Sequence, residues 1–295
     1  MSKTPAYRFP PGLVWIASFP KSGNTWMRIL LSNLAAATPH PESINSLSYA
    51  KLVVYDSVSF ENRSLVEPGL LTLAELERLR PAIHTVAAAE CRGALFSKTH
   101  DRFHRDDGEP ILGTGARAAL YLLRDPRDVA VSLAHHIGQP FDRAIASMND
   151  HRCCYGEKHQ VRHQIGRWDH HVNGWTGQTR LPVRVIRYED LRADPVGVFA
   201  AAVAFLGLDA PRDALERAVA HADFSELQRQ EKAVGFGECT RVQDRFFRSG
   251  RVGEWNEVLS PAQVREIEYV HGETMERWGY ACSQARPPAE TFGHS

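Results

Sequence analysis

Two lysines and one histidine in this chain closely follow segments that read as strands. Lys21 belongs to the loop after the apolar run 13–17, and Lys98 and His100 follow a second run, 94–97. Ligands of open α/β sheets bind at the carboxyl ends of the strands, so these side chains are candidates for chemistry on an anion. The lysines supply positive charge, and the histidine can move a proton near neutral pH.

The loop from residue 18 to residue 25 has the features of a phosphate-binding turn. It feeds a predicted helix N-terminus, where unpartnered backbone N–H groups and the positive end of the helix dipole attract anions. Gly23 permits a close backbone approach, and Lys21, Ser22 and Thr25 add donors. In a Walker A loop, G-x-x-x-x-G-K-[ST], a glycine directly precedes the lysine, whereas here Lys21 precedes the only loop glycine.

Another apolar run, residues 118–123, precedes a second helix start. Asp125 is placed to cap this helix, and Pro126 to occupy its first position. Arg124 then lies at the strand end and Ser132 two turns into the helix, so both can bind one phosphate. Charge-assisted hydrogen bonds of this kind are worth about 1.5–3 kcal/mol each. A salt bridge at the strand end is the alternative role of Arg124.

Four segments together resemble the PAPS-dependent sulfotransferase family. PKSGNTW is similar to the family's 5′-phosphosulfate loop, and KTH at residues 98–100 to its catalytic segment. YLLRDPRDVAVSLAHH, from residue 121, is similar to the 3′-phosphate motif, and RSGRVGEW, from residue 248, to the R-K-G-x-x-G-D-W element. The chain is therefore identified as a member of the soluble bacterial or cytosolic type of this family.

The resemblance implies where PAPS and its product PAP bind. The adenine would lie between aromatic rings that include Tyr188, from a Y-E-D-L segment, and Phe224. Ser249 replaces the usual lysine and removes one charge, which predicts a modestly weaker nucleotide affinity. The implied nucleotide-binding residues are Lys21, Ser22, Gly23, Asn24, Thr25, Trp26, Arg124, Ser132, Tyr188, Phe224, Arg248, Ser249 and Gly250.

The resemblance also implies a reaction. An in-line transfer would move the sulfonate of PAPS to a hydroxyl or amine of a small-molecule acceptor, and the family uses no metal there. His100 would be the general base, a role worth about 10² to 10⁴ in rate. Lys21 would neutralise charge on the phosphosulfate bridging oxygen, and Lys98 would contact the transferring group.

The order of segments predicts an α/β fold. We expect a single domain, residues 1–282, with a central parallel sheet flanked by helices and a P-loop-like strand-loop-helix phosphate site. Helices are predicted at 71–79, with Thr72 as cap, and at 262–278, and a strand at 183–188. Residues 283–295 are predicted to be a disordered tail.

The composition limits the expected binding partners and the expected location of the protein. Basic and acidic residues balance at 35 each, so we expect neither nucleic acid nor a membrane surface as a partner. The first residues lack the apolar core of a signal peptide, and no apolar run approaches the roughly 20 residues of a membrane span, so we expect a cytoplasmic protein. Five cysteines without C-x-x-C spacing predict free thiols.

Two other functions remain open on the residues alone. A metal-dependent P-loop kinase or NTPase would share the strand-loop-helix, although the Walker glycines are missing. A non-catalytic module would bind a nucleotide or a sulfated ligand without transfer. Loops 39–68, 100–115 and 135–162 are the candidates for the acceptor pocket. Their mixed composition favours a phenol, an alcohol or a natural-product scaffold, while the acceptor's identity and the oligomeric state stay open.

Overall fold

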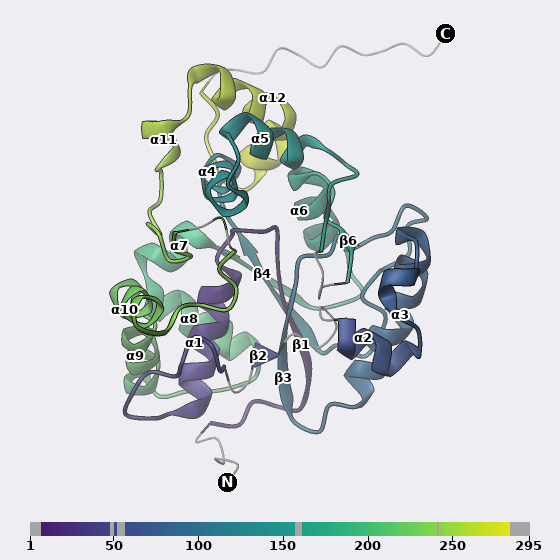
Figure 1. The fold of residues 1–295 in the computed structure, drawn as a ribbon. Coiled ribbons are helices and arrows are strands. Elements are labelled where there is room, and N and C mark those ends of the chain that lie inside the picture. The colour runs from purple at the N-terminus through teal and green to yellow at the C-terminus, as the bar shows by residue number, and fades with distance from the viewer. Residues whose placement is uncertain are drawn as a thin grey trace.

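Five parallel strands form the central sheet of the protein (Figure 1). The computed structural model describes residues 7–47, 50–51, 57–156, 161–240, 242 and 244–283. In the sheet, the strand order is β2-β3-β1-β4-β7, and all neighbouring strands are parallel. These strands are β1 (Gly12–Ser18), β2 (Ala50–Lys51), β3 (Ala94–Thr99), β4 (Ala118–Leu123) and β7 (Val183–Arg187). A separate antiparallel pair consists of β5 (Cys154–Tyr155) and β6 (His163–Gln164).

The side chains of β1 alternate between two apolar cores, one on each face of the sheet. Leu13, Trp15 and Ala17 belong to one core, and Val14 and Ile16 to the other. Central strands of a parallel sheet are buried on both faces, so their sequences read as continuous apolar runs. This is why the two apolar runs around the predicted phosphate sites form adjacent central strands.

Helices cover both faces of the sheet (Figure 1). One core contains side chains of α1 (Asn24–Ala36), α7 (Tyr188–Ala193), α8 (Pro195–Phe205), α9 (Arg212–His221) and α10 (Phe224–Val234). The other contains side chains of α2 (Ser57–Ser64), α3 (Leu73–Ala89), α4 (Pro126–Ile137), α5 (Phe141–Asn149), α6 (Trp168–Gly177) and α12 (Pro261–Arg277). The short α11 (Trp255–Val258) and a 3-10 turn (Pro68–Leu70) complete the described elements. The predicted α/β fold is confirmed.

The register between β1 and β3 positions the candidate site. Ala17 pairs with Thr99, so the next residues along the two strands, Ser18 and His100, lie side by side at this edge of the sheet. On its other side, β1 pairs with β4, which leads into Arg124. Because the carboxyl ends of parallel strands share one edge, the three predicted motifs converge there.

The predicted end of the helix at 71–79 is wrong. Thr72 caps α3 as expected, but α3 continues through Pro81. Proline cannot donate a hydrogen bond to the carbonyl of Glu77, one turn earlier. Arg105 supplies a donor in its place, with Nη1 3.4 Å from the Glu77 oxygen.

The other predicted boundaries shift only slightly. The strand predicted at 94–97 extends to Thr99, and the one predicted at 183–188 ends at Arg187, so that Tyr188 begins α7. The five cysteines are free thiols, as expected. The predicted tail lies outside the described residues beyond Ser283. Within the described part of the chain, every helix is too short or too polar to span a membrane.

Candidate active site

The loop between β1 and α1 forms a compact turn. Lys21 has φ 68° and Gly23 has φ 102°, a region that costs an L side chain roughly 1–2 kcal/mol. A Cβ on Gly23 would lie 2.8 Å from the ring of Tyr188, so the ring packs directly against the glycine. Ser22 Oγ is buried and has no hydrogen-bond partner among the described residues. The turn therefore presents a buried hydroxyl that a ligand can satisfy.

Positive side chains from β3 and α1 surround one carboxylate at the sheet edge. Glu238, in the loop after α10, has Oε2 3.0 Å from Lys98 Nζ and Oε1 2.5 Å from Arg28 Nη2. Thr25 Oγ1 lies 3.5 Å from the same Oε2. Burial disfavours the ionised carboxyl, but Lys98 and Arg28 outweigh it and hold the pKa of Glu238 well below its usual range. The edge is thus arranged to hold an anion.

Lys21 adds a further positive charge near this edge. Its Nζ lies 4.1 Å from the centroid of the Phe246 ring. Burial, and then the charges of Lys98 and Arg124, lower the pKa of Lys21 to about 7. The ammonium and amine forms therefore coexist near neutral pH. An anion bound nearby favours the charged form.

His100 is held in one tautomer by the end of β1. Its Nδ1 lies 2.7 Å from the carbonyl oxygen of Ser18 and 3.2 Å from Ser18 Oγ. A carbonyl only accepts hydrogen bonds, so Nδ1 carries the proton and Nε2 is the basic nitrogen. Burial, and then the charge of Lys98, place the pKa of His100 well below its ordinary value, which keeps the ring neutral.

The residues beside His100 fix the backbone of the segment that carries it. The Asp101 carboxylate pairs with Arg80 of α3, and both side chains are buried. Trp175 Nε1 donates to the Asp101 carbonyl at 2.9 Å, and His171 Nε2 donates to the His100 carbonyl at 3.2 Å. Contacts from α3 and α6 therefore hold the histidine in place, which a general base requires.

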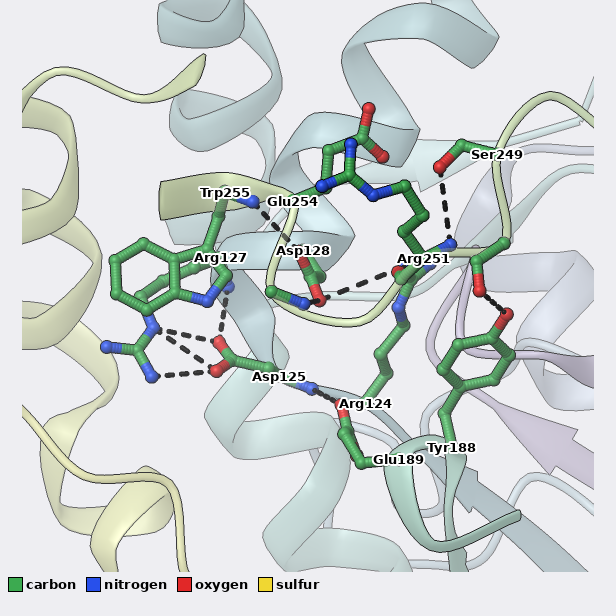
Figure 2. Close-up of polar contacts among 12 residues, drawn as sticks. Arg124, Asp125, Arg127, Asp128, Tyr188, Glu189, Ser249, Arg251, Glu254 and Trp255 are labelled. Carbon is green, nitrogen blue, oxygen red and sulfur yellow. Dashed lines mark hydrogen bonds and ion pairs between the residues drawn. The ribbon is translucent and has the colours of Figure 1, made fainter. Parts of the chain in front are cut away.

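Arg124 links the loop between β1 and α1 to the C-terminal loop, which carries residues 248–254. Its Nη1 donates to the Lys21 carbonyl at 3.1 Å. Its Nη2 donates to the Arg251 carbonyl at 2.9 Å (Figure 2). The guanidinium stacks 4.5 Å from the centroid of the Tyr188 ring. Asp128, the counterpart for the alternative salt bridge, is 3.9 Å away. Arg124 Nε is buried without a partner among the described residues, so one donor remains for a ligand.

Asp128 anchors the C-terminal loop to α4 (Figure 2). Its carboxylate accepts the backbone N–H of Gly253 at 2.7 Å and that of Trp255 at 3.1 Å. The Arg127 guanidinium lies 3.9 Å from the centroid of the Trp255 ring. The charged residues after Arg124 thus fix the loop that carries residues 248–250.

Three residues predicted to bind the 3′-phosphate, Ser132, Arg248 and Ser249, form no hydrogen bonds with one another in the described part of the chain. Arg248 Nη2 pairs with Glu254 Oε2 at 2.7 Å. Ser249 Oγ accepts the backbone N–H of Arg251 at 3.3 Å, and Ser132 is half-buried in α4. A phosphate bound by Arg248 would share the guanidinium with Glu254.

The predicted adenine residues do come together. The ring centroids of Trp26 and Tyr188 are 5.9 Å apart, and Tyr188 Oη donates to the Gly250 carbonyl at 2.9 Å. Gly250 has φ 62°, and a Cβ there would lie 2.7 Å from the Phe224 ring. Tyr188 and Phe224 therefore both contact Gly250, and Trp26 lies against Tyr188.

The sequence interpretation missed three residues of this region. Arg28 is a charged residue in an otherwise apolar stretch of helix, a signal that was available. Glu238 lies in a glycine- and arginine-rich segment without a motif. His171 of α6 is buried, with Nδ1 2.8 Å from Tyr121 Oη and Nε2 3.2 Å from the His100 carbonyl oxygen, so it links that hydroxyl to the backbone at His100.

The chain belongs to the sulfotransferase family. The family profile described as "Sulfotransferase domain" matches residues 11–279. This match confirms the family that the motifs predicted, and it makes the protein a sulfotransferase.

Similar proteins include plant enzymes and a solved structure. Cytosolic sulfotransferase 6 of Arabidopsis thaliana is 24% identical over 277 residues, which cover 90% of this chain and 78% of the relative. Flavonol 3-sulfotransferase of Flaveria bidentis is 22% identical over 294 residues, covering 92% and 85%. Retinol dehydratase, solved with androsterone and the inactive cofactor PAP, superposes with a TM-score of 0.62 at 22% identity, covering 94% and 82%. At this identity the structural likeness establishes the fold alone.

Gly23→Ala should destabilise the protein by at least about 1–2 kcal/mol, because alanine is strained at φ 102° and its Cβ meets Tyr188. Gly177→Ala is the matched control, since a Cβ there contacts nothing within 4 Å. Chemical denaturation measures both free energies of unfolding. Equal stabilities of the two variants would show that the tight turn is not required.

Proposed function

We propose that this sulfotransferase uses PAPS as its donor and transfers the sulfonate to a hydroxyl or amine of a small-molecule acceptor, with His100 as general base. The observation that carries the proposal is the meeting of an anion-binding edge with a fixed, neutral histidine. Lys98 and Thr25 already hold a carboxylate there, and His100 comes from the same strand end as Lys98.

The residues present fit the nucleotide. The buried hydroxyl of Ser22 and the unpartnered Nε of Arg124 are donors that phosphate oxygens would satisfy. Trp26, Tyr188 and Phe224 offer apolar faces for a purine. We assign the 5′-phosphosulfate to residues 21–25, and the 3′-phosphate to Arg124 together with Ser132 and the segment 248–250.

His100 would act through its Nε2. The Ser18 carbonyl fixes the proton on Nδ1, so Nε2 has the lone pair that takes the acceptor's proton as its oxygen or nitrogen attacks the sulfonate sulfur. Loss of the S–O bond to the phosphate completes the transfer and releases PAP. Because burial keeps the imidazole neutral, the basic form is the one present before reaction.

The two lysines would stabilise the charge that moves during transfer. Lys98 lies in the strand that leads to His100, which suits contact with the sulfonate group itself. Lys21 follows β1 in the phosphate loop, where an ammonium neutralises charge that develops on the bridging oxygen. Both positions are half-buried, so their electrostatic effect exceeds that of a fully solvated cation.

The acceptor is assigned by chemical class. A relative named flavonol 3-sulfotransferase supports a small hydroxylated scaffold. Arg28 and Lys98, the cations at this edge, are already paired with Glu238, so the site adds little attraction for a polyanionic acceptor.

PAP should stabilise the protein against heating, by roughly 2.7 kcal/mol at 100 times its Kd, whether or not Mg²⁺ is present. ADP, which lacks the 3′-phosphate, is the ligand control. Thermal shift with PAP, ADP and ATP, each with and without Mg²⁺, measures the effect. A shift with ATP and Mg²⁺ but none with PAP would instead indicate a P-loop kinase or NTPase.

His100→Ala should lower kcat by about 10² to 10⁴ on an acceptor with an unactivated hydroxyl, while KM for PAPS stays near wild type. His170→Ala, an exposed histidine of α6, is the matched control and should keep full activity. Steady-state assays of sulfonate transfer measure both. Near-normal turnover of His100→Ala would remove it from the base role.

PAP binding should take up a proton above neutral pH. Free Lys21 has a pKa of about 7, and the bound 5′-phosphate would raise it, so affinity should fall as pH rises from about 7.5 to 9. Calorimetry at pH 8 in buffers of different ionisation enthalpy measures the uptake. Lys21→Met should abolish it, whereas Lys232→Met, at an exposed position, should not. Absence of uptake in the wild type would place the phosphate away from Lys21.

A further inference from the structure

Glu238 reaches the anion-binding edge from a loop that is anchored on both sides. Asn45 Nδ2 donates to the Gly235 carbonyl at 2.9 Å, and Asn45 Oδ1 accepts the Gly237 N–H at 2.8 Å. After the glutamate, Thr240 Oγ1 donates to the His136 carbonyl at 2.9 Å. These hydrogen bonds hold the loop in the position that puts the Glu238 carboxylate beside Lys98 and Arg28.

The groups around Glu238 are those assigned above to the phosphosulfate. Thr25 belongs to the phosphate loop, and Lys98 precedes the proposed base. Two carboxylate oxygens resemble two oxygens of a phosphate or sulfonate in spacing and charge. A second anion at this place would meet the repulsion of Glu238 and would have to share its donors.

We propose that Glu238 is an internal ligand of the 5′-phosphosulfate site, which holds the site in the absence of nucleotide and must withdraw before PAPS binds. The inference rests on the function proposed above. In this proposal the loop 235–240 has two states, and only the state with the carboxylate withdrawn binds PAPS. The apparent association constant for PAPS is then the intrinsic constant multiplied by the fraction of molecules in that state.

A base role for Glu238 fits the contacts less well. Two cations hold the ionised form, so the carboxylate is a weak proton acceptor. A purely structural role is also limited, since Arg28 has other partners, with Nε 3.2 Å from Asn24 Oδ1 and Nη2 3.0 Å from Thr25 Oγ1. The buried guanidinium therefore keeps hydrogen bonds when the glutamate leaves.

Glu238→Gln should bind PAP about tenfold more tightly, as expected if the carboxylate occupies the site in about nine of ten free molecules. Glu216→Gln removes the same charge from a surface ion pair on α9 and should leave the affinity unchanged. Adenosine 3′-phosphate, which lacks the 5′-phosphate, is the ligand control and should bind both proteins equally. Calorimetry or a fluorescence titration measures the dissociation constants.

A second variant, which changes no charge, tests the same proposal through the loop that carries Glu238. Asn45→Ala releases both hydrogen bonds that hold the loop before Glu238, at an exposed position, and should tighten PAP binding in the same direction by a smaller factor. Unchanged or weaker PAP binding in both variants would overturn the proposal. An equal gain for adenosine 3′-phosphate would also overturn it, because the loop would then close the whole nucleotide site. If folded wild type and variants all fail to bind PAP, the donor assignment itself is wrong.

Discussion

Positive charge concentrated at the carboxyl edge of a buried sheet is the constraint on which this structure depends. Lys21, Lys98, Arg28 and Arg124 meet there with little solvent, and unpaired cations in such a place cost several kcal/mol each. The chain offsets the cost in different ways. Arg124 donates hydrogen bonds to two backbone carbonyls, and Lys98 and Arg28 form ion pairs with Glu238. The lowered pKa of Lys21 leaves part of the population uncharged at neutral pH.

The segment after α10 connects the two ends of the proposed nucleotide site. Its first part brings Glu238 to the cations beside the phosphate loop, and its last part gives the Arg251 carbonyl to Arg124. Asp128 then fixes the loop to α4 through two backbone N–H groups. In the proposed binding mode, a change at the 5′ end is therefore linked, through this segment, to the residues assigned to the 3′-phosphate.

The histidine illustrates how a polar site is built from ordinary strand geometry. His100 follows a strand whose register with β1 sets it beside Ser18, and the Ser18 carbonyl decides which nitrogen carries the proton. Buried pairs around it, such as Arg80 with Asp101, are retained although such pairs add little net stability. Their effect here is to fix the backbone on which the imidazole stands.

The sequence by itself determined the local parts of this protein. The apolar runs, the cap at Asp125, the glycine of the phosphate turn and the family motifs depend on near neighbours in the chain, and so they predicted the sheet, the helix starts and most of the candidate site. Only the tertiary structure decided which side chains from distant parts of the chain contact one another. Arg105 donates to the Glu77 carbonyl that Pro81 cannot reach, across 28 positions of sequence, and Glu238 meets Thr25 across 213 positions. Electrostatic pairing acts through space, so no local pattern could place that carboxylate among the cations.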